Sequence, residues 1–305
     1  MTEFLATNAM AALPALGESA GQGLAIILIL MCIGALAGFA GGLFGIGGGI
    51  IMVPALFLYF ETQAIAPHLI MPSAVATSLA VIIVTACRAL QTHHVAGAVD
   101  WPVLRRWFGW IGVGAFAAGQ VAPLLPQRWL VLIFAAGAFA LGVVRISKLF
   151  RRAPGRGSKT ENMAGIERAH ERAEPLTPVI AIVTGLVSGV LGIGGGAIGV
   201  MILTAAQMPI HRAVGTASGF GIAVAVPGTL AFVWSGLADA GVAMGQLPAG
   251  SLGFVNLPAA LIMAGLSVVT APMGARCAQY LSPRRLSGLF GFYIIAMAIL
   301  MICRA

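Results

Sequence analysis

The chain has 305 residues, of which 59% are hydrophobic and only 9% are charged, and its mean hydropathy is +0.99. A soluble domain carries about 25% charged residues, so this composition excludes an ordinary water-soluble protein and favours one whose outer surface faces lipid. The formal net charge of +8 does not indicate nucleic-acid binding, because the basic residues lie between apolar runs, where membrane proteins carry their positive loops.

The apolar runs predict an all-α polytopic membrane protein with about ten transmembrane segments. In chain order the segments are Leu24–Gly42, Ile46–Phe60, Ile70–Leu90, Val103–Val121, Trp129–Ser147, Pro178–Leu191, Ile193–Ala206, Ala213–Ser235, Pro258–Gln279 and Leu286–Ile302. Several are shorter than the ~20 residues that cross the hydrocarbon core. The shortest flank glycine-rich stretches, so short or broken helices or re-entrant hairpins are expected there.

The distribution of basic residues predicts an orientation in the membrane. With an extracytoplasmic N-terminus, only Arg128 and Arg304 among the 17 Lys and Arg residues lie outside, in agreement with the positive-inside rule. The polar connector Arg151–Thr177 then lies in the cytoplasm, and a short helix is expected over Lys159–Ala173. The chain is therefore expected to be a multi-pass protein of the cell inner membrane. Its predicted parts are a first transmembrane repeat at 24–148, a cytoplasmic linker at 149–177 and a second transmembrane repeat at 178–303.

Three sequence blocks recur in the same order on both sides of the connector. The first block, Gly38–Gly49, resembles Gly185–Gly196, and both copies end in G-I-G-G-G. The later blocks are Ala74–Ser78 with Ala213–Ala217, and Gly97–Pro102 with Gly253–Pro258. Each half carries five segments, an odd number, so the second half enters the membrane from the opposite side. This pattern predicts an inverted repeat with a binding site at the repeat interface, as in many secondary transporters.

The two G-I-G-G-G clusters are the first candidates for substrate binding. Glycine runs permit positive φ, and a helix that begins there presents unpaired N–H groups and a partial positive charge, which suits an oxyanion. Close helix packing without a ligand is the alternative explanation. The candidate glycines are Gly45, Gly47, Gly48, Gly49, Gly192, Gly194, Gly195 and Gly196.

Four hydroxyl side chains, Thr77, Ser78, Thr216 and Ser218, lie early in matched segments and are the remaining candidates for substrate binding. A hydroxyl can donate a hydrogen bond to an anion, but it can equally bond to its own helix or to a neighbouring one. Neutral donors are expected to hold the ligand, because Arg88 and Arg276 are predicted to lie near cytoplasmic segment ends.

Asp100 and Asn256 occupy matching places two residues before a proline, where each is expected to cap the following helix. No nucleophile–base pair and no metal-ligand spacing is visible in the sequence, so no catalytic residue, metal or cofactor is expected. An intramembrane enzyme is disfavoured for the same reason, since ionisable groups mark such sites and are nearly absent from the apolar segments.

The doubled glycine cluster, Pro54, the two A-V-x-T blocks and the two G-x-V-[DN] blocks resemble the sulfite exporter TauE/SafE family, also called sulfonate uptake permeases. The resemblance implies a secondary transporter that moves sulfite, an organosulfonate or a related sulfur oxyanion by alternating access. An anion channel of the same fold and an exporter of a small carboxylate remain open. The expected partners are a small anionic substrate and the lipid bilayer. A coupling proton or ion and a homodimer are left open, and no nucleic acid is expected.

Overall fold

The computed structural model describes residues 2–45, 47–63, 65–150, 177–239, 246–280 and 283–303. The helix expected at Lys159–Ala173 lies outside these residues. The described parts contain ten α-helices, one for each predicted segment, so the all-α polytopic architecture is confirmed. The helices are α1 (Thr2–Phe44), α2 (Gly49–Glu61), α3 (Pro67–Val95), α4 (Trp101–Val121), α5 (Gln127–Phe150), α7 (Thr177–Leu191), α8 (Gly196–Ala205), α9 (Ile210–Ala238), α11 (Leu257–Tyr280) and α12 (Pro283–Ile302).

Two small elements supplement the helices. A 3-10 turn, η1 (Ala122–Leu124), follows α4. Strands β1 (Ser251–Leu252) and β2 (Val255–Asn256), of two residues each, form an antiparallel hairpin directly before α11. Ser251 pairs with Asn256 in this hairpin. The hairpin fixes the path of the chain into α11 and places Asn256 directly before this helix.

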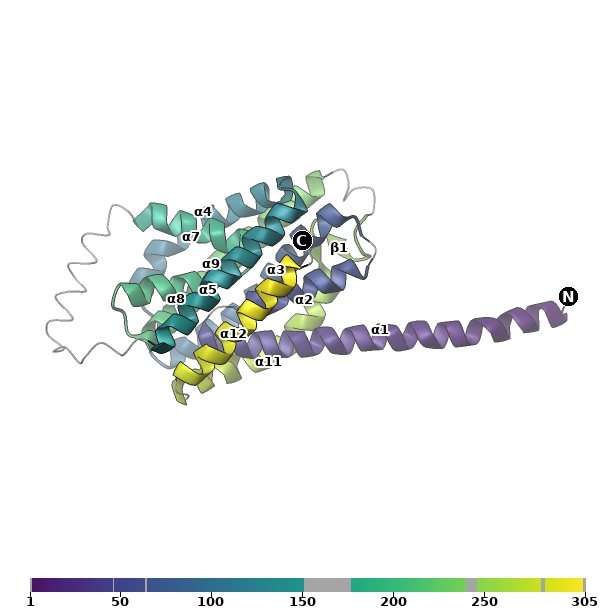
Figure 1. Ribbon diagram of the computed structural model, residues 1–305, viewed down its shortest axis with the longest axis horizontal. Coiled ribbons are helices and arrows are strands. Elements are labelled where there is room, and N and C mark those ends of the chain that lie inside the picture. Colours follow the sequence, from purple (N-terminus) through teal and green to yellow (C-terminus); the bar gives the residue numbers. More distant parts are fainter. Residues whose placement is uncertain are drawn as a thin grey trace.

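Five helices are long and apolar enough to cross a membrane by length and composition. These spans are Gly23–Phe44, Pro67–Val95, Gln127–Val144, Ile210–Ala238 and Leu257–Ala278. Large apolar side chains such as Trp234 and Leu261 are about 70% exposed, as expected of a surface that faces lipid. The molecule is thus a bundle of apolar helices, from which α1 extends toward the N-terminus (Figure 1).

The helices that flank the glycine clusters are short, as the sequence predicted. Helix α2 has 13 residues and α8 has 10, which correspond to about 20 and 15 Å at ~1.5 Å per residue. Neither reaches the ~30 Å of a hydrocarbon core. Helix α1 ends at Phe44 before α2 begins, and α7 ends at Leu191 before α8 begins, so the two glycine clusters interrupt the helices.

Helices of the first five pack mainly against helices of the last five. Helix α1 packs on α11, α4 packs on α7 and α9, α3 packs on α9 and α11, and α5 lies beside α12 (Figure 1). Glycines permit the closest approaches: a β-carbon added at Gly42 in α1 would meet the carbonyl of Ala271 in α11, and one at Gly185 in α7 would meet the carbonyl of Ile111 in α4. Such glycine contacts are typical of helices that associate within a membrane.

Candidate functional site

The two glycine clusters form turns with the same backbone conformation. Three matching pairs of glycines have positive φ, which the glycine runs permit: Gly45 and Gly192 at 66° and 63°, Gly47 and Gly194 at 72° and 69°, and Gly48 and Gly195 at 78° and 68°. Gly48 and Gly195 are the N-cap residues of α2 and α8. Because an L side chain is disfavoured in this region of φ, the turns require glycine.

The two turns touch each other inside the bundle. A β-carbon on Gly49 would collide with the carbonyl of Gly192 and would lie 2.9 Å from the Cα atom of Ile193. The candidate glycines of both clusters are buried. The structure therefore brings together two segments that are far apart in sequence, and the starts of α2 and α8 lie at this junction.

The two candidate threonines each bond to the other half of the chain. Thr77 Oγ1 accepts a hydrogen bond of 3.0 Å from the backbone N–H of Asn256, and Thr216 Oγ1 accepts one of 2.9 Å from the backbone N–H of Asp100. Both threonines are fully buried. The second repeated block of each half therefore contacts the third block of the other half. Because each hydroxyl accepts in these bonds, its own O–H group remains able to donate a hydrogen bond.

The two candidate serines differ in their partners. Ser78 Oγ donates to the carbonyl of Val75 at 2.8 Å and lies 3.3 Å from the carbonyl of Gly192, so it joins α3 to the second glycine turn. Ser218 Oγ donates to the carbonyl of Val214 at 3.0 Å, within its own helix. Ser78 thus belongs to the junction of the turns, whereas the hydrogen bond of Ser218 is local.

Asp100 and Asn256 are both helix caps, which confirms that prediction. Asp100 Oδ1 accepts from the N–H of Val103 at 3.3 Å, and Asn256 Oδ1 accepts from the N–H of Ala259 at 3.0 Å. Their remaining polar atoms differ. Asp100 Oδ2 forms an ion pair with Arg212 Nη2 at 2.9 Å, whereas Asn256 Nδ2 donates to the hydroxyl of Ser251 at 3.1 Å.

Two further residues of α3 contact the first glycine turn and its approach. Thr85 Oγ1 lies 3.2 Å from the carbonyl of Gly47, and His93 Nε2 lies 3.3 Å from the carbonyl of Gly42. Both side chains are buried. Neither residue was among the sequence candidates, and the position of Thr85 has no hydroxyl counterpart in the second half.

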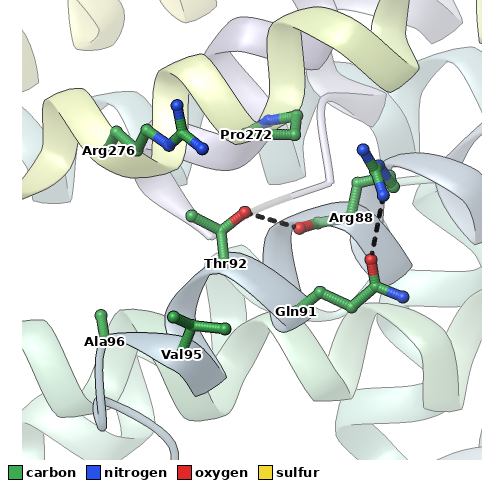
Figure 2. Close-up of a pocket in the computed structure, with 7 residues that line it drawn as sticks. All are labelled: Arg88, Gln91, Thr92, Val95, Ala96, Pro272 and Arg276. Carbon is green, nitrogen blue, oxygen red and sulfur yellow. Dashed lines mark hydrogen bonds between the residues drawn. The ribbon is translucent and has the colours of Figure 1, made fainter.

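An open pocket of about 450 Å³ lies between the C-terminal parts of α3 and α11 (Figure 2). Its lining residues are Arg88, Gln91, Thr92, Val95, Ala96, Pro272 and Arg276. Helix α3 continues to Val95, five residues beyond the predicted end at Leu90. Arg88 was predicted to lie near the end of this helix, but it lies seven residues before it. The polar run after Leu90 lowers the hydropathy, but it remains helical because His93 packs inside against Gly42.

Comparison with known proteins places the chain among membrane transporters. The family model described as "Sulfite exporter TauE/SafE" matches residues 30–301. A "Probable membrane transporter protein" of Haemophilus influenzae is 30% identical over 90% of this chain and 97% of its own length. One of Methanocaldococcus jannaschii is 25% identical over 92% of this chain and 96% of its own.

Some relatives are longer than this chain. The "Probable membrane transporter protein MamO" of Magnetospirillum gryphiswaldense is 26% identical over 92% of this chain but only 46% of its own length. No solved structure matches significantly. The family match covers nearly all the described helices and concerns transporters rather than enzymes. The chain therefore belongs to the sulfite exporter TauE/SafE family of membrane transporters.

Proposed function

We propose that the chain is a secondary transporter that moves a small anion, such as sulfite, an organosulfonate or a related sulfur oxyanion, across the inner membrane by alternating access. The observation that carries this proposal is the junction of the two glycine turns, flanked by the crosswise bonds of Thr77 to Asn256 and of Thr216 to Asp100. A paired and interrupted arrangement of this kind is typical of binding sites in secondary transporters.

The proposal includes two inverted five-helix repeats, at 24–148 and 178–303, joined by a cytoplasmic linker at 149–177. The pairing of helices supports it. If a twofold axis relates the halves, the packing of α1 on α11 must recur as α7 on α4, and that of α3 on α11 as α9 on α4. Both pairs of contacts are present, and the fifth helices, α5 and α12, pack on each other. An axis in the membrane plane would give the halves opposite orientations.

In the proposed site, neutral groups hold the anion where the turns meet. The N-termini of α2 and α8 each contribute roughly half a positive charge, so that together they offset about one negative charge. Turn glycines such as Gly48 and Gly195 would supply backbone N–H groups, and the hydroxyls of Thr77 and Thr216 would supply directional bonds. Among the described residues, the buried polar side chains are hydroxyls, one amide and one imidazole. A site of neutral donors fits that environment and would release its cargo readily.

Uptake into proteoliposomes tests this function. Purified protein is reconstituted, and entry of labelled sulfite, methanesulfonate and acetate is measured with and without unlabelled anion trapped inside. The proposal predicts uptake of a sulfur oxyanion that is accelerated by the trapped anion, because a carrier exchanges its cargo. Flux that is indifferent to the trapped anion would indicate a channel. Preference for acetate would indicate a carboxylate exporter.

A further inference from the structure

The pocket between α3 and α11 has the charge of an anion site (Figure 2). Arg88 and Arg276 line it from opposite helices, and both side chains are exposed. Arg88 Nη1 donates to the neutral Gln91 Oε1 at 3.2 Å. In the described parts of the chain, no ion pair joins either arginine to a carboxylate. Two guanidinium groups with unused donors therefore line one opening, and guanidinium groups are well suited to bind oxyanions.

The C-terminal turns of α3 connect this pocket to the first glycine turn. Thr85, Arg88 and Thr92 share one face of the helix, and Thr77 lies further along the same face, beyond the apolar Val81. Thr85 lies one turn from Arg88, and its hydroxyl contacts the carbonyl of Gly47 in the first glycine turn. Thr77 lies about 16 Å along the axis from Arg88. The pocket and the candidate site are thus linked along one face of one helix.

The corresponding place in the other half lacks this character. By the repeat alignment, Pro227 in α9 stands where Arg88 does, and Gln120 in α4 stands where Arg276 does. There, α4 and α9 are joined directly: Gln120 Nε2 donates to the carbonyl of Ala231 at 3.0 Å, and Ser235 Oγ donates to the carbonyl of Gly119 at 2.9 Å. The pocket between α3 and α11 is therefore open and basic, while its counterpart has hydrogen bonds between the two helices and no arginine at these two places.

We propose that the pocket lined by Arg88 and Arg276 is a second anion-binding site, an entry site that takes up the small sulfur oxyanion before it moves to the glycine turns. The inference rests on the proposed function, of which it names a further step. A volume of about 450 Å³ accommodates such an ion together with part of its hydration shell, so that capture at the entry site does not require full desolvation. The two arginines raise the local concentration of anions at this opening.

The test compares Arg88→Gln, Arg276→Gln and the double variant with the wild type, in vesicles of neutral phosphatidylcholine. Sulfite uptake is measured as a function of concentration. The double variant is expected to raise KM about tenfold or more, because charge-assisted hydrogen bonds to the anion are lost, with little change in kcat. Arg88→Lys should recover part of the loss. Arg105→Gln removes an exposed arginine outside the pocket and should leave KM unchanged.

Two further measurements keep the outcomes distinct. The phosphate of an anionic lipid shares the chemistry of the ligand, so the series is repeated with phosphatidylglycerol in the vesicles. An arginine effect confined to phosphatidylglycerol vesicles would assign the pocket to lipid and overturn the entry site. Sulfite binding to the purified protein in detergent is measured by calorimetry. If the wild type transports sulfite and the double variant has an unchanged KM, the entry site is refuted while the proposed function stands.

If the wild type transports no sulfur oxyanion, the proposed function fails. Calorimetry still shows whether the pocket binds an anion. Weaker sulfite binding in the double variant than in Arg105→Gln would support the pocket as an anion site. Equal binding in these two variants, or no binding to the wild type, would overturn it. Elution of all variants as the wild-type species in size-exclusion chromatography excludes unfolding as the cause of any difference.

Discussion

The two glycine turns are nearly identical in backbone, yet the side chains around them differ. Matching φ angles agree within about ten degrees at Gly45 and Gly192, at Gly47 and Gly194, and at Gly48 and Gly195. Around the first turn, the polar residues include Thr85, which has no hydroxyl counterpart in the second half, and around the caps an ion-paired Asp100 corresponds to a buried, uncharged Asn256. The comparison indicates that the backbone path is the shared requirement, and that each half adapts its polar groups to its own end of the molecule.

Replacing each cap residue by the one found in the other half should give the largest difference in stability between the two halves. Asn256→Asp places a carboxylate where the side chain is only 2% exposed and where its Nδ2 now donates to Ser251. An uncompensated buried charge should cost roughly 3 kcal/mol or more, so we expect a clear fall in the melting temperature of the purified protein. Asp100→Asn is the matched control. It keeps the cap and loses an ion pair whose arginine side chain is 53% exposed, a change worth about 1 kcal/mol or less.

Alanine at the N-cap glycines tests the shared backbone path. Gly48→Ala and Gly195→Ala force a β-carbon into positive φ, at a cost of about 1–2 kcal/mol each before any clash is counted. We expect both variants to lose sulfite uptake in proteoliposomes. Gly265→Ala, whose β-carbon would meet nothing within 4 Å, should transport normally. Wild-type rates in both N-cap variants would show that the turns are not needed for transport.

The hydrogen bonds of Thr77 to Asn256 and of Thr216 to Asp100 should contribute equally to the free energy of unfolding. Thr77→Val and Thr216→Val each leave a backbone N–H, that of Asn256 or Asp100, without its partner inside the bundle. Each change should therefore lower stability by about 1–3 kcal/mol. Thr→Ser at either position keeps the hydroxyl and should retain most of the stability. A large loss at one position and none at the other, measured by thermal unfolding, would contradict the proposed symmetry.

The sequence predicted the helices well because most of each helix is apolar, and it predicted the breaks because a run of glycines is unfavourable inside a helix. It also predicted the two caps, which depend on local residue chemistry, and it indicated that the glycine runs permit positive φ. Helix boundaries were predicted less accurately. The end of α3 was placed five residues early, because the run from Gln91 to His94 is polar, and the contact of His93 with Gly42 cannot be predicted from this run alone.

Contacts between distant segments could not be predicted from the residues alone. Nothing local to Thr77 indicates that its hydroxyl accepts the N–H of Asn256, or that Thr85 faces the carbonyl of Gly47. The pocket between α3 and α11 is another such case, since Arg88 and Arg276 are far apart in sequence and each alone is compatible with a charge at a membrane surface. These features follow from how the helices pack rather than from any one segment.

The central claim, that the halves are inverted repeats, is tested most directly by labelling two matched positions. Thr62 and Ala206 are the C-cap residues of α2 and α8, and both are exposed. In a background with Cys32, Cys87, Cys277 and Cys303 replaced by alanine, a single cysteine is introduced at each position in turn, and intact cells are treated with a membrane-impermeant maleimide. We predict that Thr62→Cys is labelled from outside and that Ala206→Cys is labelled only after the cells are opened. Labelling of both from the same side would contradict the inverted repeat.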